Sequence, residues 1–133
     1  MKRKALATHL GLLLLAASFI SGIAQAKQFV CTAAVAYSSE PDGKLRVKEG
    51  HLKGNQTVFT VDTSTGVVQG DQVVPLGTYT VAYPGTGADG AKLLRIDAAR
   101  LQVIFVATNA SSPYPFLFTD GVVTLAGTCR PSS

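Results

Sequence analysis

The chain has 133 residues, 47% of them hydrophobic and 15% charged, with two cysteines and no tryptophan. This length suits one small domain with one core. Twelve basic residues against eight acidic ones give a formal net charge of +4, but three of the basic residues are Lys2, Arg3 and Lys4.

Residues 1–26 have the composition of a cleaved secretory signal peptide. The basic start is followed by a Leu- and Ala-rich run over 5–20 and by the small-x-small cleavage pattern Ala24-Gln25-Ala26. That run is short for a membrane span and no second one follows, so we expect an exported chain, periplasmic or extracellular, with no membrane insertion after processing. From Lys27 onward nine basic residues face eight acidic ones, a net +1. This near balance argues against a nucleic-acid partner.

The remaining single domain, 27–133, has an all-β pattern. Runs rich in β-branched and aromatic residues recur between turn residues, and no useful helical periodicity is present. We expect about eight strands. Most connections between them are too short for a crossover helix, so strands that follow one another in sequence should be antiparallel neighbours. Eight runs are 28–37, 44–49, 57–62, 78–83, 91–97, 101–108, 114–119 and 122–129. Two shorter runs lie at 67–68 and 73–75, and Pro75 is expected to end the second one or to place it at an edge.

Alternation predicts which side chains point inward in two of these runs. One face of the run 28–37 carries Phe29, Cys31, Ala33, Val35 and Tyr37. In the run 44–49, Leu45 and Val47 are predicted to face inward, with basic side chains between them facing out. The run 101–108 is the most continuously apolar, and we expect it to be covered on both faces.

The two cysteines, Cys31 and Cys129, lie near the two ends of the domain. In an exported protein such a pair predicts a disulfide. Asp120-Gly121 separates the last two runs, which is a strong hairpin signal. A bond between the first and last strands favours a small antiparallel up-and-down β-barrel, with a two-sheet β-sandwich as the alternative.

Two short motifs resemble functional sites but lack their context. The stretch 85–90 matches G-x-G-x-x-G, yet a strand follows it where a dinucleotide site needs a helix. The stretch 62–66 has neither the contiguous Asp-Thr/Ser-Gly of an aspartic protease nor, at Val73, the closing Glu of a calcium loop. Both are interpreted as turns. We expect no enzymatic activity, no catalytic residues, no metal and no cofactor.

Five residues are candidates for a binding surface. His51 is the one histidine from Lys27 onward, and without a recognisable nucleophile we expect it to be a solvated loop residue rather than a catalytic base. Arg95, Asp97 and Arg100 are expected to form an ion cluster, and Tyr114 lies at an irregular, exposed strand end between two prolines. The candidates are His51, Lys53, Arg95, Arg100 and Tyr114.

These features lead to an expected function without an enzyme's machinery. The expectation is an exported β-barrel that binds another macromolecule, a protein or an envelope component, at the cell envelope. In architecture the chain resembles the small periplasmic lysozyme inhibitors, although it lacks their Ser-Gly-x-x-Tyr type of loop, and the resemblance implies an inhibitor-like module. The alternative is a carrier of a small apolar ligand inside an aromatic-lined barrel.

Overall fold

The computed structural model describes residues 28–52, 54 and 56–132. The predicted signal peptide and the candidate Lys53 lie outside these residues. The described part is entirely β-structure, turns and loops, as expected. It contains no helix of the length and apolar character needed to cross a membrane.

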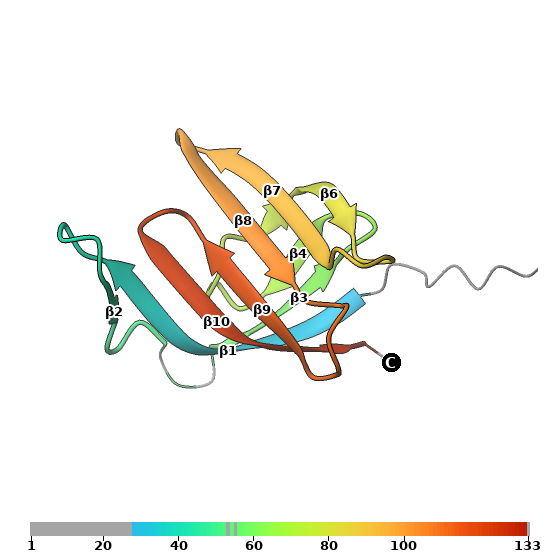
Figure 1. The fold of residues 1–133 in the computed structure, drawn as a ribbon, viewed down its shortest axis with the longest axis horizontal. Coiled ribbons are helices and arrows are strands. Elements are labelled where there is room, and N and C mark those ends of the chain that lie inside the picture. The colour runs from blue at the N-terminus through green and yellow to red at the C-terminus, as the bar shows by residue number, and fades with distance from the viewer. Residues whose placement is uncertain (1–27, 53, 55, 133) are drawn as a thin grey trace, which may run out of the picture.

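The described residues form ten strands in one antiparallel sheet (Figure 1). The predicted run 78–83 is divided at Tyr79 between β5 and β6, and the predicted run 73–75 is not a strand. Pro75 has no N–H to give to a ladder, which is consistent with that second outcome. The strands are β1 Gln28–Ser39, β2 Leu45–Val47, β3 Val58–Asp62, β4 Val67–Gly70, β5 Gly77–Thr78, β6 Thr80–Pro84, β7 Ala91–Asp97, β8 Arg100–Val106, β9 Tyr114–Thr119 and β10 Val123–Pro131.

The strand order nearly closes the sheet into an up-and-down barrel. Hydrogen-bonded neighbours run β5-β4-β3-β1-β10-β9-β8-β7-β6, with β2 added beside β1. The two ends of this path, β5 and β6, are separated in the chain by Tyr79 alone. One bent segment therefore pairs with β4 through its first half and with β7 through its second half. The predicted barrel is confirmed, and the sandwich alternative is not seen.

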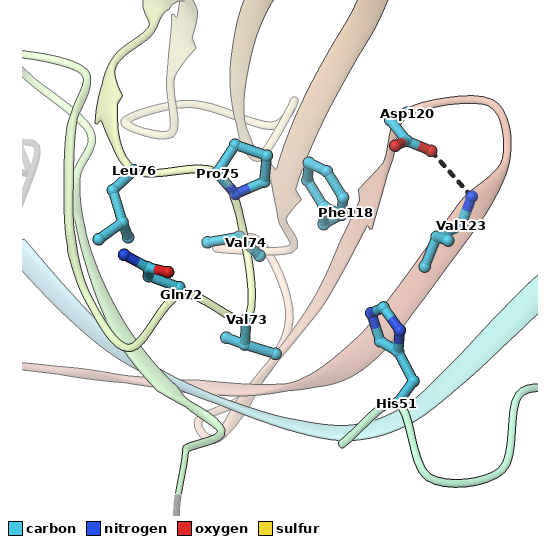
Figure 2. Close-up of a pocket in the computed structure, with 9 residues that line it drawn as sticks. All are labelled: His51, Gln72, Val73, Val74, Pro75, Leu76, Phe118, Asp120 and Val123. Atoms are coloured by element: carbon cyan, nitrogen blue, oxygen red, sulfur yellow. Dashed lines mark hydrogen bonds between the residues drawn. The ribbon is translucent and has the colours of Figure 1, made fainter. Parts of the chain in front are cut away.

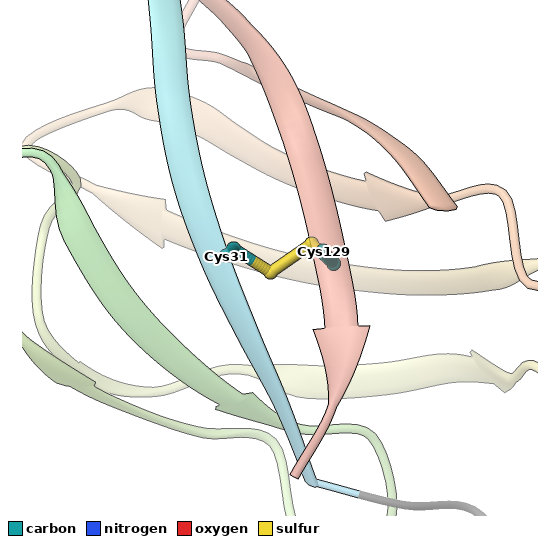
Figure 3. Close-up of a disulfide and its surroundings, with 2 residues drawn as sticks. All are labelled: Cys31 and Cys129. Carbon is teal, nitrogen blue, oxygen red and sulfur yellow. A yellow bond between two sulfur atoms is a disulfide. The ribbon is translucent and has the colours of Figure 1, made fainter. Parts of the chain in front are cut away.

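The disulfide joins Cys31 to Cys129, as predicted (Figure 3). The two residues are direct partners in the register of β1 with β10, and both side chains are fully buried. The bond therefore lies within the sheet and joins β1 and β10, the first and last strands of the chain, across 98 positions of sequence. Such a bond persists in a non-reducing compartment, which is consistent with export.

Large side chains fill the middle of the barrel. The rings of Phe59 and Phe116 meet edge to face, with centroids 5.2 Å apart. Leu93, Ile104 and Leu125 are completely buried around them. This packing fills the aromatic-rich interior that the carrier hypothesis required to be hollow.

A β-bulge changes the inward face of β1. The register with β10 shifts between Ala33 and Val35. Beyond this point Ala36 is buried, whereas Val35 and Tyr37 are half-buried. The predicted single face is therefore correct up to Ala33 and wrong after it, because one extra residue reverses the alternation.

Two other burial predictions are wrong. Leu45 and Val47 are both exposed, because β2 pairs with the end of β1 and contributes nothing to the barrel core. In β8 the inward side chains are Gln102, Ile104 and Val106, so one face is buried. Its other face runs from an exposed Leu101 to half-buried side chains, since no second layer covers it.

The β7–β8 and β9–β10 hairpins have different turns. In β7–β8 the turn residues Ala98 and Ala99 both have positive φ, 47° and 63°. The β9–β10 turn runs from Asp120 to Val123, longer than the two residues predicted, and only Gly121 in it has positive φ. Asp120 Oδ1 accepts the N–H groups of Val122 and Val123 at 2.9 and 2.8 Å, which stabilises the longer turn.

Candidate functional site

An open recess and several exposed apolar side chains lie at one end of the barrel, which we call the hairpin end. It comprises the β1–β2 connection, the turns at Ala98–Ala99 and Asp120–Val123, and the segment 71–76. Figure 1 shows these hairpins projecting away from the C-terminus. The opposite end, the loop end, carries the glycine-rich connection 85–90 and the connection 107–113.

The segment 71–76 crosses the hairpin end and covers the core there. Val74 is fully buried, and Val73 and Leu76 pack against the core. The backbone N–H of Asp71 donates to the carbonyl of Val58 at 2.9 Å, and the N–H of Val58 donates to Asp71 Oδ2 at 3.2 Å. The segment is therefore held to the barrel although it forms no strand.

Arg95 and Tyr79 fasten the far part of this segment. The Tyr79 hydroxyl donates to the Pro75 carbonyl at 2.8 Å, and Arg95 Nη1 donates to the Leu76 carbonyl at 2.8 Å. Arg95 Nε also donates to Oε1 of the buried Gln102 at 2.9 Å. Burial raises the pKa of the Tyr79 phenol, partly offset by the charge of Arg95. The side chain of Arg95 is only 21% exposed, so this residue points into the barrel end and not outward.

An open recess of about 520 Å³ lies beside the segment (Figure 2). Its lining is about equally polar and apolar, with Phe118 and Val123 facing the segment and His51 at the edge. Binding pockets for small groups fall in the range of about 300–1,000 Å³. The lining residues are His51, Gln72, Val73, Val74, Pro75, Leu76, Phe118, Asp120 and Val123.

Asp120 gives the recess one anionic group. Burial acts to raise its pKa, but the N–H groups of Val123 and Val122 and the charge of Arg100 outweigh burial and hold the pKa below its usual value. Arg100 Nη1 lies 3.8 Å from Asp120 Oδ2. The carboxylate therefore stays ionised at neutral pH and is already partly neutralised.

Exposed apolar side chains also gather on the hairpins of this end. Ile96 is 76% exposed, and its cross-strand partner Leu101 is 52% exposed. The exposed apolar residues of the three hairpins are Leu45, Val47, Ile96, Leu101 and Val122. Ile96 and Leu101 are adjacent across the two strands, and adjoining exposed apolar residues mark interaction surfaces more often than single scattered residues do.

The structure separates the predicted binding candidates into two groups. His51, Arg95 and Arg100 all lie at the hairpin end. Tyr114 begins β9 at the loop end, where it is half-buried and meets Phe29 edge to face at 5.9 Å. The predicted surface therefore does not form one site.

The predicted ion cluster forms only in part. Arg95 Nη2 lies 3.9 Å from Asp97 Oδ2, whereas Arg100 pairs with Asp120 instead of Asp97. The two arginines point to different neighbours because Arg95 is inward-facing in β7 and Arg100 begins β8 at the hairpin turn. The main contact of Arg95 is thus its hydrogen bond to the segment 71–76.

The sequence analysis did not predict that the segment 71–76 covers the core, or that Gln102 is a buried partner of Arg95. Pro75 in an apolar context was the available signal for a chain that leaves the sheet. Gln102 in an otherwise apolar run was the available signal for a buried polar partner, since such a group requires a hydrogen bond. Asp120 was interpreted as a turn former alone, although it also lines the recess.

The two motif-like stretches are turns in the structure. Asp62 Oδ1 accepts the N–H groups of Ser64 and Thr65 and the hydroxyl of Ser64. The Ser64 hydroxyl contributes most to holding the pKa of Asp62 below its usual value. Residues 85–90 connect β6 to β7 without a helix. Within the described ranges, no cluster of three or more His, Cys, Asp or Glu side chains could hold a metal ion.

The fold and site define a small, disulfide-bonded antiparallel barrel with an open recess and exposed apolar side chains on the hairpins at one end. No family model, curated protein or solved structure matches this chain. A proposal for the function of this protein therefore rests on the geometry of the hairpin end.

Proposed function

We propose that this protein is an exported, non-enzymatic binding module that holds another protein at the cell envelope through its hairpin end, in the manner of an inhibitor. The observation that carries the proposal is the exposure of apolar side chains on hairpins at the same end of the barrel as an open recess. Ile96 and Leu101 form a cross-strand pair largely in solvent. Covering such a pair by a partner would remove apolar surface from water, which is the main driving force of association.

The charges of the hairpin end favour a protein partner over nucleic acid. Arg46 lies 3.6 Å from Asp42, and Arg100 lies 3.8 Å from Asp120. Positive and negative groups are thus interspersed, whereas a nucleic-acid surface presents a one-sign basic patch. Mixed charges around an apolar centre are typical of protein interfaces.

The recess supplies a place for an anchoring side chain of the partner. Hot spots in interfaces are large side chains that fill desolvated pockets near the centre. Phe118, Val123 and Leu76 would contact an apolar group there, and His51 and Asp120 would lie at its polar edge.

A carrier of a small apolar ligand is the second candidate, supported by the volume of the recess, about 520 Å³. The ligand would sit in this open recess at the barrel mouth, because the middle of the barrel is filled by Phe59, Phe116 and their neighbours.

The test is site-specific photo-crosslinking of the exported protein in cells of its source. A photoreactive phenylalanine analogue is placed at Ile96 or Val122, and at Val30 on the outside of β1 as the control position. We expect a discrete protein adduct from Ile96 and Val122 that is absent from Val30. The Val122 adduct should be lost in an Ile96→Asp, Leu101→Asp background, and the Ile96 adduct in a Leu101→Asp background. Equal labelling from all three positions would contradict the hairpin end as the interface.

The carrier function predicts a different outcome. Adducts would be absent, and mass spectrometry of the natively purified protein would show a bound small molecule that is lost on substitution of Phe118→Ala. That result would replace the protein partner with a ligand in the recess.

A further inference from the structure

A second hollow lies on the outer surface at the loop end, far from the recess. It has a volume of about 390 Å³ and is lined by Tyr83, Ala88, Asp89, Gly90, Lys92, Phe105 and Asn109. Its base is one row across three strands, since Tyr83 pairs with Lys92 and Lys92 with Phe105. The side chains of this row face outward, because their sequence neighbours Ala91, Leu93, Ile104 and Val106 are buried.

The glycine-rich connection 85–90 forms the wall of this hollow and is held in place by two hydrogen bonds. Thr108 Oγ1 donates to the Gly85 carbonyl at 3.0 Å, and Asn109 Nδ2 donates to the Ala88 carbonyl at 2.9 Å. A Cβ on Gly90 would lie 2.9 Å from the Phe105 ring, so this glycine allows the backbone to rest against the aromatic side chain. The wall is therefore built against the base and is not a loose loop.

The groups around the hollow define the chemistry of a ligand. Tyr83 is 50% exposed and Phe105 is half-buried, which leaves aromatic surface available for stacking. In the described part of the chain, Lys92 and Asp89 form no salt bridge with each other or with any other residue. One ammonium, one carboxylate and a side-chain amide together offer donors and acceptors with no net charge.

We propose that this hollow binds a neutral oligosaccharide. Sugar rings present an apolar C–H face that can stack on Tyr83 and Phe105, and hydroxyl groups that both donate and accept hydrogen bonds. Asp89 would accept from hydroxyls and Lys92 would donate to them. A phosphate-bearing ligand fits less well, because the attraction of Lys92 for an anion is offset by the repulsion of Asp89.

The shape of the surface fits a chain of sugars. A smaller hollow of about 200 Å³ lies along the same connection and shares Tyr83, Asp89 and Gly90 with the first. Tyr83 thus lies between two adjoining depressions, which gives an extended ligand two neighbouring positions. The site is independent of the hairpin end, so its failure would leave the proposed protein partner untouched.

The experiment is a titration of the ¹⁵N-labelled chain from Lys27 onward with cellotetraose, chitotetraose and maltotetraose, followed by NMR. At least one sugar should shift the amide signals of residues 83–92, 105 and 109 while signals of the hairpin end stay in place. Tyr83→Ala should weaken binding about tenfold, the equivalent of one stacking contact, and Tyr83→Phe should retain most of it. Asp89→Asn should weaken it several-fold by removing a charged acceptor.

One control shares the surface without lining either hollow. Leu117→Ala alters an exposed residue in the next strand of the same row. This variant should bind as the wild type does. The proposal would be overturned by the absence of shifts with all three sugars at millimolar concentration, by unchanged binding in Tyr83→Ala, or by tighter binding of a thymidine tetranucleotide than of any sugar.

Discussion

The guanidinium carbon of Arg95 lies 4.7 Å from the centre of the Tyr79 ring, and each of the two side chains also holds a carbonyl of the segment 71–76. A cation over an aromatic face contributes roughly 0.5–2 kcal/mol, depending on its desolvation. The pair thus couples the bent strand that closes the barrel to the segment that covers its hairpin end.

Removing Arg95 should therefore destabilise the protein far more than removing a surface arginine. We expect Arg95→Ala to lower the free energy of unfolding by about 2–3 kcal/mol, because Gln102 and the Leu76 carbonyl lose a charged donor. Arg100→Ala, which breaks an ion pair at an exposed arginine, should cost at most about 1 kcal/mol. Urea unfolding of both variants measures the difference, and equal losses would contradict the role of Arg95 as a fastener.

The turn at Ala98 and Ala99 should be open to stabilisation. Left-handed backbone costs roughly 1–2 kcal/mol for a residue with a Cβ, and Asn-Gly is a preferred pair in two-residue hairpin turns with positive φ. We expect the double substitution Ala98→Asn, Ala99→Gly to raise the free energy of unfolding by about 1 kcal/mol, after the added freedom of the unfolded chain is subtracted.

Ala110→Gly is the matched control for that turn, because Ala110 lies in a loop and does not have positive φ. It should destabilise the protein slightly through the unfolded chain. Thermal unfolding of the two variants should give melting temperatures that move in opposite directions, and a fall in both would argue that the alanine turn carries no strain.

Gly127 should be intolerant of any side chain. A Cβ at this position would lie 2.0 Å from the Thr32 carbonyl oxygen and 2.7 Å from Phe116 Cε1. Gly127→Ala must move backbone on β1 beside its bulge, and we expect a loss of about 3 kcal/mol or more in unfolding free energy. Gly87→Ala, with open space around its Cβ, should change stability by well under that amount. A tolerated Gly127→Ala would show that β1 and β10 can separate at low cost.

The disulfide should contribute a large part of the stability. The loop that it closes spans 98 positions, for which the chain-entropy model gives about 4–5 kcal/mol, although measured values are often smaller. The double substitution Cys31→Ser, Cys129→Ser avoids leaving a free thiol, and its melting temperature should be markedly lower than that of the wild type. No change would indicate that the register of β1 with β10 is sufficient without the bond.

Acid should destabilise the protein in part through two aspartates. The pKa values of Asp62 and Asp120 are lowered in the folded state from the ordinary value of 3.8. Their contribution is therefore complete above that ordinary value and is lost as the pH falls through the lower folded values. The Asp62→Asn, Asp120→Asn variant should lose less stability than the wild type between neutral pH and strong acid, as measured by urea unfolding across pH. Parallel curves would contradict this assignment.

Most of the strand runs, the disulfide and the barrel were predictable from the sequence, because alternation is a local signal and an exported domain with two cysteines offers one pairing. The Asp120-Gly121 hairpin was also predictable in kind, but its length depends on hydrogen bonds from Val122 and Val123 to the Asp120 side chain. The Asp-Gly dipeptide alone does not predict those hydrogen bonds.

The candidate site required the tertiary structure. The inward turn of Arg95, the cover formed by the segment 71–76 and the reversal of β1 after Ala33 all depend on contacts between residues far apart in the chain. The sequence by itself determined the alternating strands and the cysteine pair that can bridge them. Only the tertiary structure decided which side chains meet at each end of the barrel, because a bulge or a bent strand redirects every residue that follows it.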